Sequence, residues 1–172
     1  MRSMLFVPGD RPERFTKAAA SGADAVILDL EDAVVPERRP YARVEIVQWL
    51  ASAERPVPVW VRINAVETDD SLRDLAAVID GRPDGIVLPK ARDGADVHRV
   101  DHWLEVLEAR LGQPRGSIGL LPLITESAGA LLRAASFTAL PSRVAGLTWG
   151  AEDLAADVGA LGNKASDGES EL

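Results

Sequence analysis

Short apolar runs recur along the chain at a nearly constant step, and this repeat constrains the fold more than any other feature. The runs are rich in Val, Ile and Leu and show no strict alternation of apolar and polar residues. Such runs are typical of parallel strands that are covered on both faces. We therefore expect six buried strands, over residues 4–7, 25–28, 57–63, 85–88, 118–124 and 144–149.

The segments between these runs carry helical signals. A first helix is expected to begin at Asp10, a good N-cap followed by Pro12, and to end near residues 21–22. A second is expected over residues 36–53 and a third over residues 96–111. Their apolar faces would comprise Val44, Val47 and Leu50 in the second helix, and Val100, Trp103, Leu104, Leu107 and Leu111 in the third. The chain therefore reads as a β-α unit repeated about six times.

Alternating strands and helices allow two architectures, an open doubly wound sheet or a closed barrel. The dinucleotide-binding form of the first would need G-x-G-x-x-G after the opening strand, and that motif is absent. Strand centres advance by roughly 28 residues, so eight units would need about 225–250 residues, the size of a barrel. We expect an α/β fold of the (β/α)8 TIM-barrel type with about six units present, or an open six-stranded relative.

Composition narrows the function classes. The 172 residues include no Cys, which excludes disulfides, thiolate zinc sites, iron-sulfur centres and a cysteine nucleophile, and which favours the cytoplasm. The formal net charge of -8 argues against nucleic acid as a partner. No apolar stretch is long enough for a signal peptide or a membrane span. Residues 1–160 are expected to form one incomplete barrel domain, and residues 161–172 a polar, acidic, disordered tail.

Charged and amide side chains follow the ends of the predicted strands. They are Asp29, Glu31, Asp32, Arg62, Asn64, Lys90, Glu126, Glu152 and Asp153. In a barrel the carboxyl ends of the strands meet at one mouth, where active sites of this architecture are built. Carboxylates that gather there repel one another unless a cation joins them. Oxygen-only ligands indicate Mg²⁺, with Mn²⁺ as an alternative.

Each of these residues also has a structural interpretation. A carboxylate just after a strand is often a helix N-cap, which applies to Asp29, Asp32 and Asp153. Arg62 could form a core salt bridge instead of binding a carboxylate of a substrate. Glu126 follows an apolar run, where a buried carboxylate without a partner would be costly.

Other candidate sites have weaker support. The sequence does not decide whether Lys90 lies on the surface or belongs to the site. His98 and His102 are four residues apart, but charged neighbours make a solvated helix face the better interpretation. The motifs G-x-S-x-G, P-loop and H-E-x-x-H are all absent, so serine hydrolysis, Walker-type nucleotide binding and zinc proteolysis lack sequence support.

Six ordered motifs resemble one known family. They are RSMLFVPG at 2–9, GADAVILDLEDAV at 22–34, VRIN at 61–64, LPK at 88–90, TESA at 125–128 and GAEDL at 150–154. Together they are similar to the citrate lyase beta-subunit family of CoA-ester lyases, whose wider group includes malyl-CoA lyases and metal-dependent pyruvate aldolases. The resemblance covers about residues 2–160 and implies a (β/α)8 barrel.

The resemblance also implies site roles. Glu126 and Asp153 match the residues that hold Mg²⁺, Arg62 matches an arginine on the keto-acid, and Glu31 and Asp32 match groups that hold metal-bound water. Backbone N–H groups of Asp153 and Leu154, near a helix start, could bind a carboxylate oxygen of the substrate.

The activity implied is Mg²⁺-dependent cleavage of a 3-hydroxyacyl-CoA, like citryl-CoA or malyl-CoA, to a keto-acid and an acyl-CoA. A basic cluster is a candidate for the CoA phosphates, with a solvated helix surface as the alternative; it comprises Arg11, Arg14, Lys17, Arg38 and Arg39. Relatives of this kind suggest a trimer or hexamer.

The chain also departs from the family pattern. Arg39 stands where a Lys is usual, and two further strands and a C-terminal segment would follow the GAEDL motif, so the chain is expected to be truncated. Two alternatives therefore stay open: a pyruvate-type aldolase that needs no CoA, and a catalytically incompetent fragment that acts as an assembly partner.

Overall fold

Five parallel strands form one sheet in the computed structural model, which describes residues 2–52 and 54–161. The strands are β1 (Met4–Pro8), β2 (Ala25–Asp29), β3 (Val59–Arg62), β4 (Gly85–Leu88) and β5 (Gly119–Pro122). Their order in the sheet is their order in the chain, without the reversal that marks a doubly wound sheet. The expected α/β fold with a parallel sheet is confirmed.

The prediction of a sixth regular strand over residues 144–149 is wrong. This segment runs parallel to β5 but makes only two isolated bridges, Leu120 with Val144 and Leu123 with Thr148. Leu120 and Leu123 are three residues apart, whereas their partners Val144 and Thr148 are four residues apart. One extra residue of this kind, as in a β-bulge, breaks the hydrogen-bond ladder.

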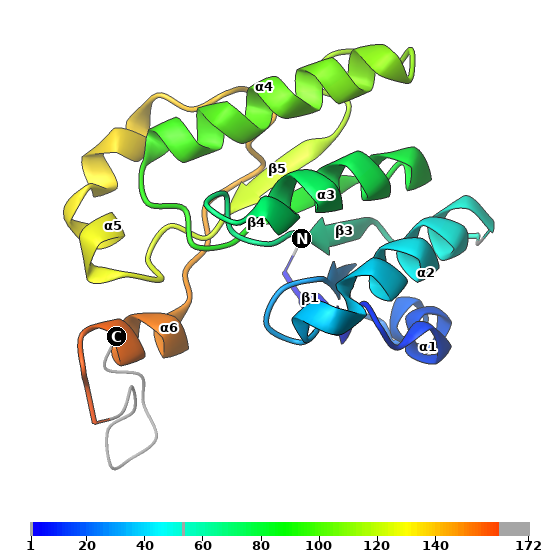
Figure 1. The fold of residues 1–172 in the computed structure, drawn as a ribbon, viewed down its shortest axis with the longest axis horizontal. Coiled ribbons are helices and arrows are strands. Elements are labelled where there is room, and N and C mark those ends of the chain that lie inside the picture. The colour runs from blue at the N-terminus through cyan, green and yellow to red at the C-terminus, as the bar shows by residue number, and fades with distance from the viewer. Residues whose placement is uncertain (1, 53, 162–172) are drawn as a thin grey trace.

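Helices connect the strands and cover the sheet. They are α1 (Phe15–Ala19), α2 (Arg39–Ser52), α3 (Asp69–Val78), α4 (Gly94–Arg110), α5 (Ala128–Leu132) and α6 (Ala151–Asp157), with 3-10 turns at Pro12–Arg14, Pro36–Arg38, Ile79–Gly81 and Ala134–Thr138. Figure 1 shows α2, α3 and α4 following one another along one face of the sheet. None of the helices in the described part of the chain is both long and apolar enough to cross a membrane.

Two expectations about the helices need correction. Asp10 is not an N-cap, because Arg11 holds that position and the Asp10 carboxylate accepts a hydrogen bond from Arg38 Nε at 2.7 Å. Val44 is 52% exposed, so the buried face of α2 is offset from the expected one and includes Ala42 and Ile46 beside Leu50. The β-α repeat also implied a helix between β3 and β4 without giving its bounds, and α3 occupies this segment.

The core has two parts, one on each face of the sheet. Alternate strand residues such as Leu28, Val61 and Ile86 pack against the helices. The other residues of the same strands, among them Ile27 and Trp60, form a smaller cluster on the inner face. Burial on both faces explains why the strands read as continuous apolar runs.

Trp60 fills much of the inner face. A β-carbon at Gly85 would overlap the Trp60 ring, and one at Gly119 would lie 2.8 Å from it. Glycine is therefore required where β4 and β5 pass this indole. The tail expected over residues 161–172 lies outside the described residues from 162 onward.

Candidate active site

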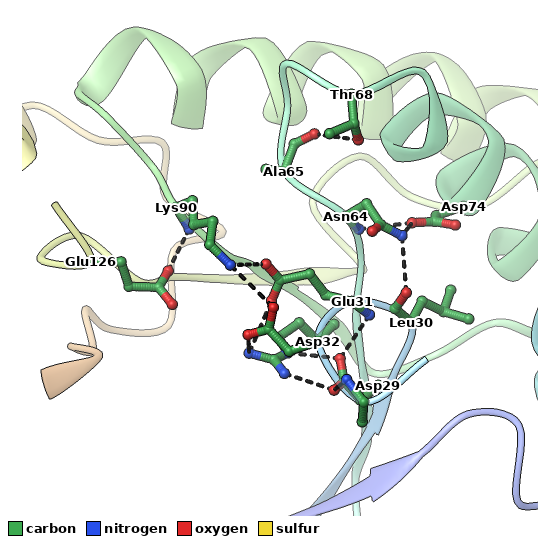
Figure 2. Close-up of polar contacts among 12 residues, drawn as sticks. Asp29, Leu30, Glu31, Asp32, Asn64, Ala65, Thr68, Asp74, Lys90 and Glu126 are labelled. Carbon is green, nitrogen blue, oxygen red and sulfur yellow. Dashed lines mark hydrogen bonds and ion pairs between the residues drawn. The ribbon is translucent and has the colours of Figure 1, made fainter. Parts of the chain in front are cut away.

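Polar side chains meet at the carboxyl ends of the strands, as the sequence predicted. Asp29 ends β2, Arg62 ends β3, Lys90 follows β4 and Glu126 follows β5. Asp153 is the third residue of α6, which follows the bridged segment 144–148. Figure 2 shows the polar contacts that link most of this group.

Asp29 and Arg62 form the most buried contact of the site. Arg62 Nε donates to Asp29 Oδ1 at 2.7 Å, and Arg62 Nη2 donates to Asp29 Oδ2 at 2.6 Å. The same carboxylate accepts from the backbone N–H groups of Glu31 and Ala33. Burial acts to lower the pKa of Arg62, but the hydrogen bonds to Asp29 outweigh burial and raise it. Arg62 is therefore a permanent cation, and it forms the core ion pair that was the structural interpretation of this residue.

Glu31 and Asp32 lie between Arg62 and Lys90. Arg62 Nη1 is 3.0 Å from Glu31 Oε2 and 3.6 Å from Asp32 Oδ2. Lys90 Nζ donates to Glu31 Oε1 and, at 3.3 Å, to Asp32 Oδ1. Burial raises the pKa of Glu31, while the ammonium of Lys90 and the charge of Arg62 oppose that rise. The Glu31 side chain is buried and that of Asp32 is 55% exposed, so solvent reaches the group from the Asp32 side.

Lys90 joins this acidic group to Glu126. Its backbone has a left-handed φ of 52°, and its N–H donates to Glu126 Oε2. Figure 2 shows the Lys90 side chain extending from the vicinity of Glu126 to Glu31. The sequence left Lys90 open between a surface role and a site role, and the structure places it in the centre of the group.

Glu126 and Asp153 are close enough to interact directly. Burial, and then the hydrogen-bonded carboxyl of Asp153, raises the pKa of Glu126 to about 7. Gly150 makes room for this arrangement, because a β-carbon there would lie 2.7 Å from Glu126 Cγ. Two neighbouring carboxyl groups, one of them buried, form a site that a cation would stabilise.

This pair of carboxyl groups fits Mg²⁺. The described part of the chain contains no cluster of three or more His, Cys, Asp or Glu placed to hold a metal ion by themselves. Mg²⁺ is commonly held by one or two carboxylates and takes its remaining ligands from water and substrate. A cavity of about 570 Å³, lined by Glu126, Asp153 and Lys90 among others, lies beside the pair and offers room for such ligands.

The start of α6 differs from the expected arrangement. Asp153 is inside the helix and Gly150 is its N-cap, so the N-cap interpretation of Asp153 is wrong. The Leu154 side chain is buried, and its N–H already donates to the Gly150 carbonyl at 3.2 Å. The expectation that this N–H binds substrate is therefore not supported by the structure.

Asn64 and Asp74 hold the end of β3 in place, and no role was predicted for Asp74 from the sequence. Asp74 Oδ2 accepts from both the backbone N–H and Nδ2 of Asn64 at 2.7 Å. Asn64 Nδ2 also donates to the Leu30 carbonyl, which fixes the turn after β2 (Figure 2). A helical spacing of Ser71, Asp74 and Val78 on one face is the signal that could have revealed this buried carboxylate.

The basic cluster considered for CoA phosphates is partly neutralised. Arg38 pairs with Asp10 at 2.7 Å and Arg39 with Asp70 at 2.7 Å. Arg14 and Lys17 instead line a separate cavity of about 690 Å³ between β1 and α1. The five residues therefore do not form one free cationic surface.

Comparison with known proteins gives consistent matches along the chain. The family model described as HpcH/HpaI aldolase/citrate lyase matches residues 2–169. A citrate lyase subunit beta-like protein of Mycobacterium tuberculosis is 41% identical over 164 residues, which are 95% of this chain and 52% of the relative. An L-malyl-CoA/beta-methylmalyl-CoA lyase of Rhodobacter capsulatus is 36% identical over 167 residues, with 92% of this chain and 50% of the relative covered. This chain thus spans about half the length of the curated relatives it matches.

Solved structures give the same result. A citrate lyase beta subunit of M. tuberculosis complexed with oxaloacetate and magnesium superposes with a TM-score of 0.77 at 38% identity, covering 98% of this chain and 66% of that one. The M. tuberculosis protein CitE in complex with magnesium, acetoacetate and coenzyme A gives a TM-score of 0.75 at 37% identity, covering 98% and 55%.

Proposed function

We propose that this chain, which belongs to the HpcH/HpaI aldolase/citrate lyase family, carries the metal and keto-acid subsites of a Mg²⁺-dependent CoA-ester lyase. The observation that carries the proposal is the pairing of Glu126 with Asp153 beside the Arg62 and Lys90 cations. Carboxylates for a divalent ion and cations for an anionic substrate are the two requirements of such a site.

The proposed architecture is a (β/α)8 barrel, of which the described residues contain five strands. The sequential order of five parallel strands supports it, as do the structural matches to citrate lyase beta subunits. In a barrel, the carboxyl ends of the strands form the active-site face. The residues named above lie at those ends.

Each residue has a proposed role. Glu126 and Asp153 hold Mg²⁺, which when bound acts as a Lewis acid on substrate oxygens. Arg62 binds a carboxylate or keto oxygen of the substrate through N–H groups that Asp29 does not use. Glu31 and Asp32 accept hydrogen bonds from water at the site, and the start of α6 at Asp153 favours an anionic group.

The proposed reaction breaks the carbon-carbon bond next to a hydroxyl group of a 3-hydroxyacyl-CoA. The hydroxyl group loses its proton and its carbon becomes the carbonyl of a keto-acid, while the electrons of the broken carbon-carbon bond move into the thioester enolate. The enolate then gains a proton to give an acyl-CoA. A relative named as a malyl-CoA lyase supports a substrate of this class. Neighbours solved with oxaloacetate, and with acetoacetate and coenzyme A, support keto-acid and CoA subsites.

Isothermal titration of the purified chain with oxaloacetate, with and without Mg²⁺, tests the proposal. We expect Mg²⁺-dependent binding that is lost in Glu126→Gln and in Arg62→Ala, with circular dichroism as the control for folding. Titration heats that are unchanged in Glu126→Gln would overturn the metal assignment. Competition by free CoA for a CoA-ester substrate separates the lyase from a pyruvate-type aldolase.

A second candidate is an assembly role. Among the described strands, β1 ends the sheet and exposes Phe6 at 48%, whereas residues 144–148 bridge the outer side of β5. An open edge of this kind can pair with another chain. In either case the proposal includes a homo-oligomer, a trimer or hexamer, located in the cytoplasm. Light scattering after size-exclusion chromatography measures the oligomeric state. A chain that is oligomeric but binds no oxaloacetate would favour the assembly role.

A further inference from the structure

Arg92 borders the same cavity as the two carboxyl groups that are proposed to hold Mg²⁺. The cavity, of about 570 Å³, lies between the loops after β3, β4 and β5 and helix α6, and its lining includes Glu126, Asp153 and Arg92. Its volume falls in the range of small-molecule pockets, about 300–1,000 Å³. A ligand bound to an ion at Glu126 and Asp153 would therefore lie in a space that Arg92 also borders.

A buried carboxylate fixes the Arg92 guanidinium. Arg92 Nε and Nη2 donate to the two oxygens of Asp96, at 2.9 and 2.8 Å, and the Arg92 backbone N–H donates to the same carboxylate at 3.1 Å. The Asp96 side chain is 3% exposed. The Arg92 carbonyl accepts a hydrogen bond from Arg133 Nε at 3.1 Å. Because Arg92 is held at its side chain and its backbone, it would lose little conformational freedom when it binds a ligand.

The arrangement at Arg92 repeats the one at Arg62. In each residue one carboxylate accepts from Nε and Nη2 and leaves Nη1 for another partner. Arg62 Nη1 lies 3.0 Å from Glu31 Oε2. Arg92 Nη1, in contrast, donates no hydrogen bond to any residue in the described part of the chain. The Arg92 guanidinium is thus oriented and still has a donor to offer.

The other charged groups of the cavity leave Arg92 as its available cation. Lys90 also lines the cavity, but its ammonium donates to Glu31 and Asp32. Glu67 forms an ion pair with Arg92, with Glu67 Oε1 2.5 Å from Arg92 Nε, and both side chains are 43% exposed. Ion pairs between exposed side chains are weak, so a ligand carboxylate can compete with Glu67 for the guanidinium.

We infer that Arg92 is a specificity-determining residue that binds the second carboxylate of a dicarboxylic keto-acid, while the first carboxylate is bound at the Mg²⁺ position. A planar guanidinium with a free donor matches a carboxylate. A keto-acid with one carboxylate would leave Arg92 paired with Glu67. This inference rests on the proposed function, because it takes Glu126 and Asp153 as the metal ligands, and it adds the class of keto-acid.

Binding of two keto-acids that differ by one carboxylate tests the inference without any assay of activity. Freshly dissolved oxaloacetate and pyruvate are each titrated calorimetrically into the chain in the presence of Mg²⁺. Pyruvate lacks the second carboxylate, so the ratio of the two affinities isolates the contribution of that group. We expect Arg92→Met to lower the oxaloacetate-to-pyruvate affinity ratio by about tenfold or more, because a hydrogen bond between two charged groups is lost.

Arg99→Met is the matched control. Arg99 is 49% exposed in its side chain and lies 3.9 Å from the same Asp96 carboxylate, but it does not line the cavity. Its removal changes the net charge by the same amount, and salt screens its longer-range effect, so the ratio should stay within about threefold of wild type. An equal fall in the ratio for Arg99→Met and Arg92→Met would show a general effect of charge and would overturn the inference.

A double variant guards against misfolding, because Arg92→Met alone leaves the buried Asp96 carboxylate without its cation. The variant that combines Arg92→Met with Asp96→Asn removes both charges and keeps the net charge of wild type. The same fall in the ratio is expected, with circular dichroism as the control for folding. A wild-type ratio in the folded double variant would overturn the inference.

The variant Glu126→Gln separates this inference from the proposed function. If wild type binds neither keto-acid in the presence of Mg²⁺, or if Glu126→Gln binds both as wild type does, the proposed function fails and the inference fails with it. If wild type binds pyruvate only with Mg²⁺, Glu126→Gln does not bind it, and the ratio is unchanged in the Arg92 variants, only the inference about Arg92 fails.

Discussion

Asp29 and Arg62 are register partners in β2 and β3, and their side chains form a two-point ion pair at 2.6 and 2.7 Å. The Asp29 side chain is 2% exposed and the Arg62 side chain is 11% exposed. The pair therefore ties two adjacent strands together and fixes the direction of the guanidinium at the carboxyl end of the sheet.

Asp29→Asn is expected to destabilise the chain. The substitution leaves the buried Arg62 guanidinium without its two-point partner, and breaking a buried pair costs about 3–5 kcal/mol. Urea unfolding followed by circular dichroism measures the change. Asp32→Asn is the matched control, since an exposed pair contributes at most about 1 kcal/mol. Equal losses in the two variants would contradict the structural role of the Asp29 pair.

Gly150→Ala is expected to weaken Mg²⁺ binding while the fold is kept. The added β-carbon would lie 2.7 Å from Glu126 Cγ, so the Glu126 side chain must move away from its position beside Asp153. Gly146→Ala, in the same segment, is the control because its β-carbon would meet only Leu121 Cδ1 at 3.8 Å, an ordinary contact. Calorimetric titration should show a loss of at least about tenfold for Gly150→Ala alone. Similar losses in both alanine variants would show that the segment, and not Glu126, is disturbed.

The stability that Glu126 contributes to the metal-free chain should decrease as pH rises. Its pKa is about 7 in the folded chain, raised by burial and by Asp153 from an ordinary value of 4.5. Between these values the folded chain holds a proton that the unfolded chain has released, so stability falls with rising pH. The contribution is complete below the ordinary value and lost once the pH passes about 7.

Unfolding free energies of wild type and Glu126→Gln, measured in chelator from about pH 5 to about pH 8, test this expectation. The glutamine side chain does not titrate, so the difference between the two proteins isolates Glu126. A difference that stays constant, or that grows in favour of wild type, across this range would refute the raised pKa.

Arg143→Met is expected to destabilise the chain by about 3–5 kcal/mol, because it leaves two carboxylates buried without their cation. Arg143 is 2% exposed in its side chain and pairs with Asp101 at 2.5 Å and with Glu108 at 2.7 Å. Arg115→Met is the control, since the Arg115 side chain is 78% exposed and its loss should cost less than about 1 kcal/mol. Urea denaturation of both variants makes the comparison. A loss for Arg143→Met as small as the control's would mean that the buried network does not stabilise the chain.

The sequence by itself determined the strands and the place of the chemistry. All five strands begin within two residues of the expected position, and Gly85–Leu88 was predicted at both ends. Burial on both faces of a parallel sheet produces continuous apolar runs, and such runs are a local signal. Asp29 directly follows its run, Arg62 lies near the end of its run and Glu126 comes two residues after its own, so their arrival at one edge of the sheet follows from the parallel arrangement.

The tertiary structure decided which of these groups are paired. The partners of Lys90 are 36, 58 and 59 residues away in the chain, and no periodicity encodes such distances. Asp74 had no role in the prediction from the sequence, yet its carboxylate is fully buried against Asn64 and Arg43. The bulge opposite β5 and the contact of Gly150 with Glu126 likewise arise only when two segments pack. Apolar burial acts on each segment through its own pattern, whereas ion pairs and close contacts depend on which segments the complete fold brings together.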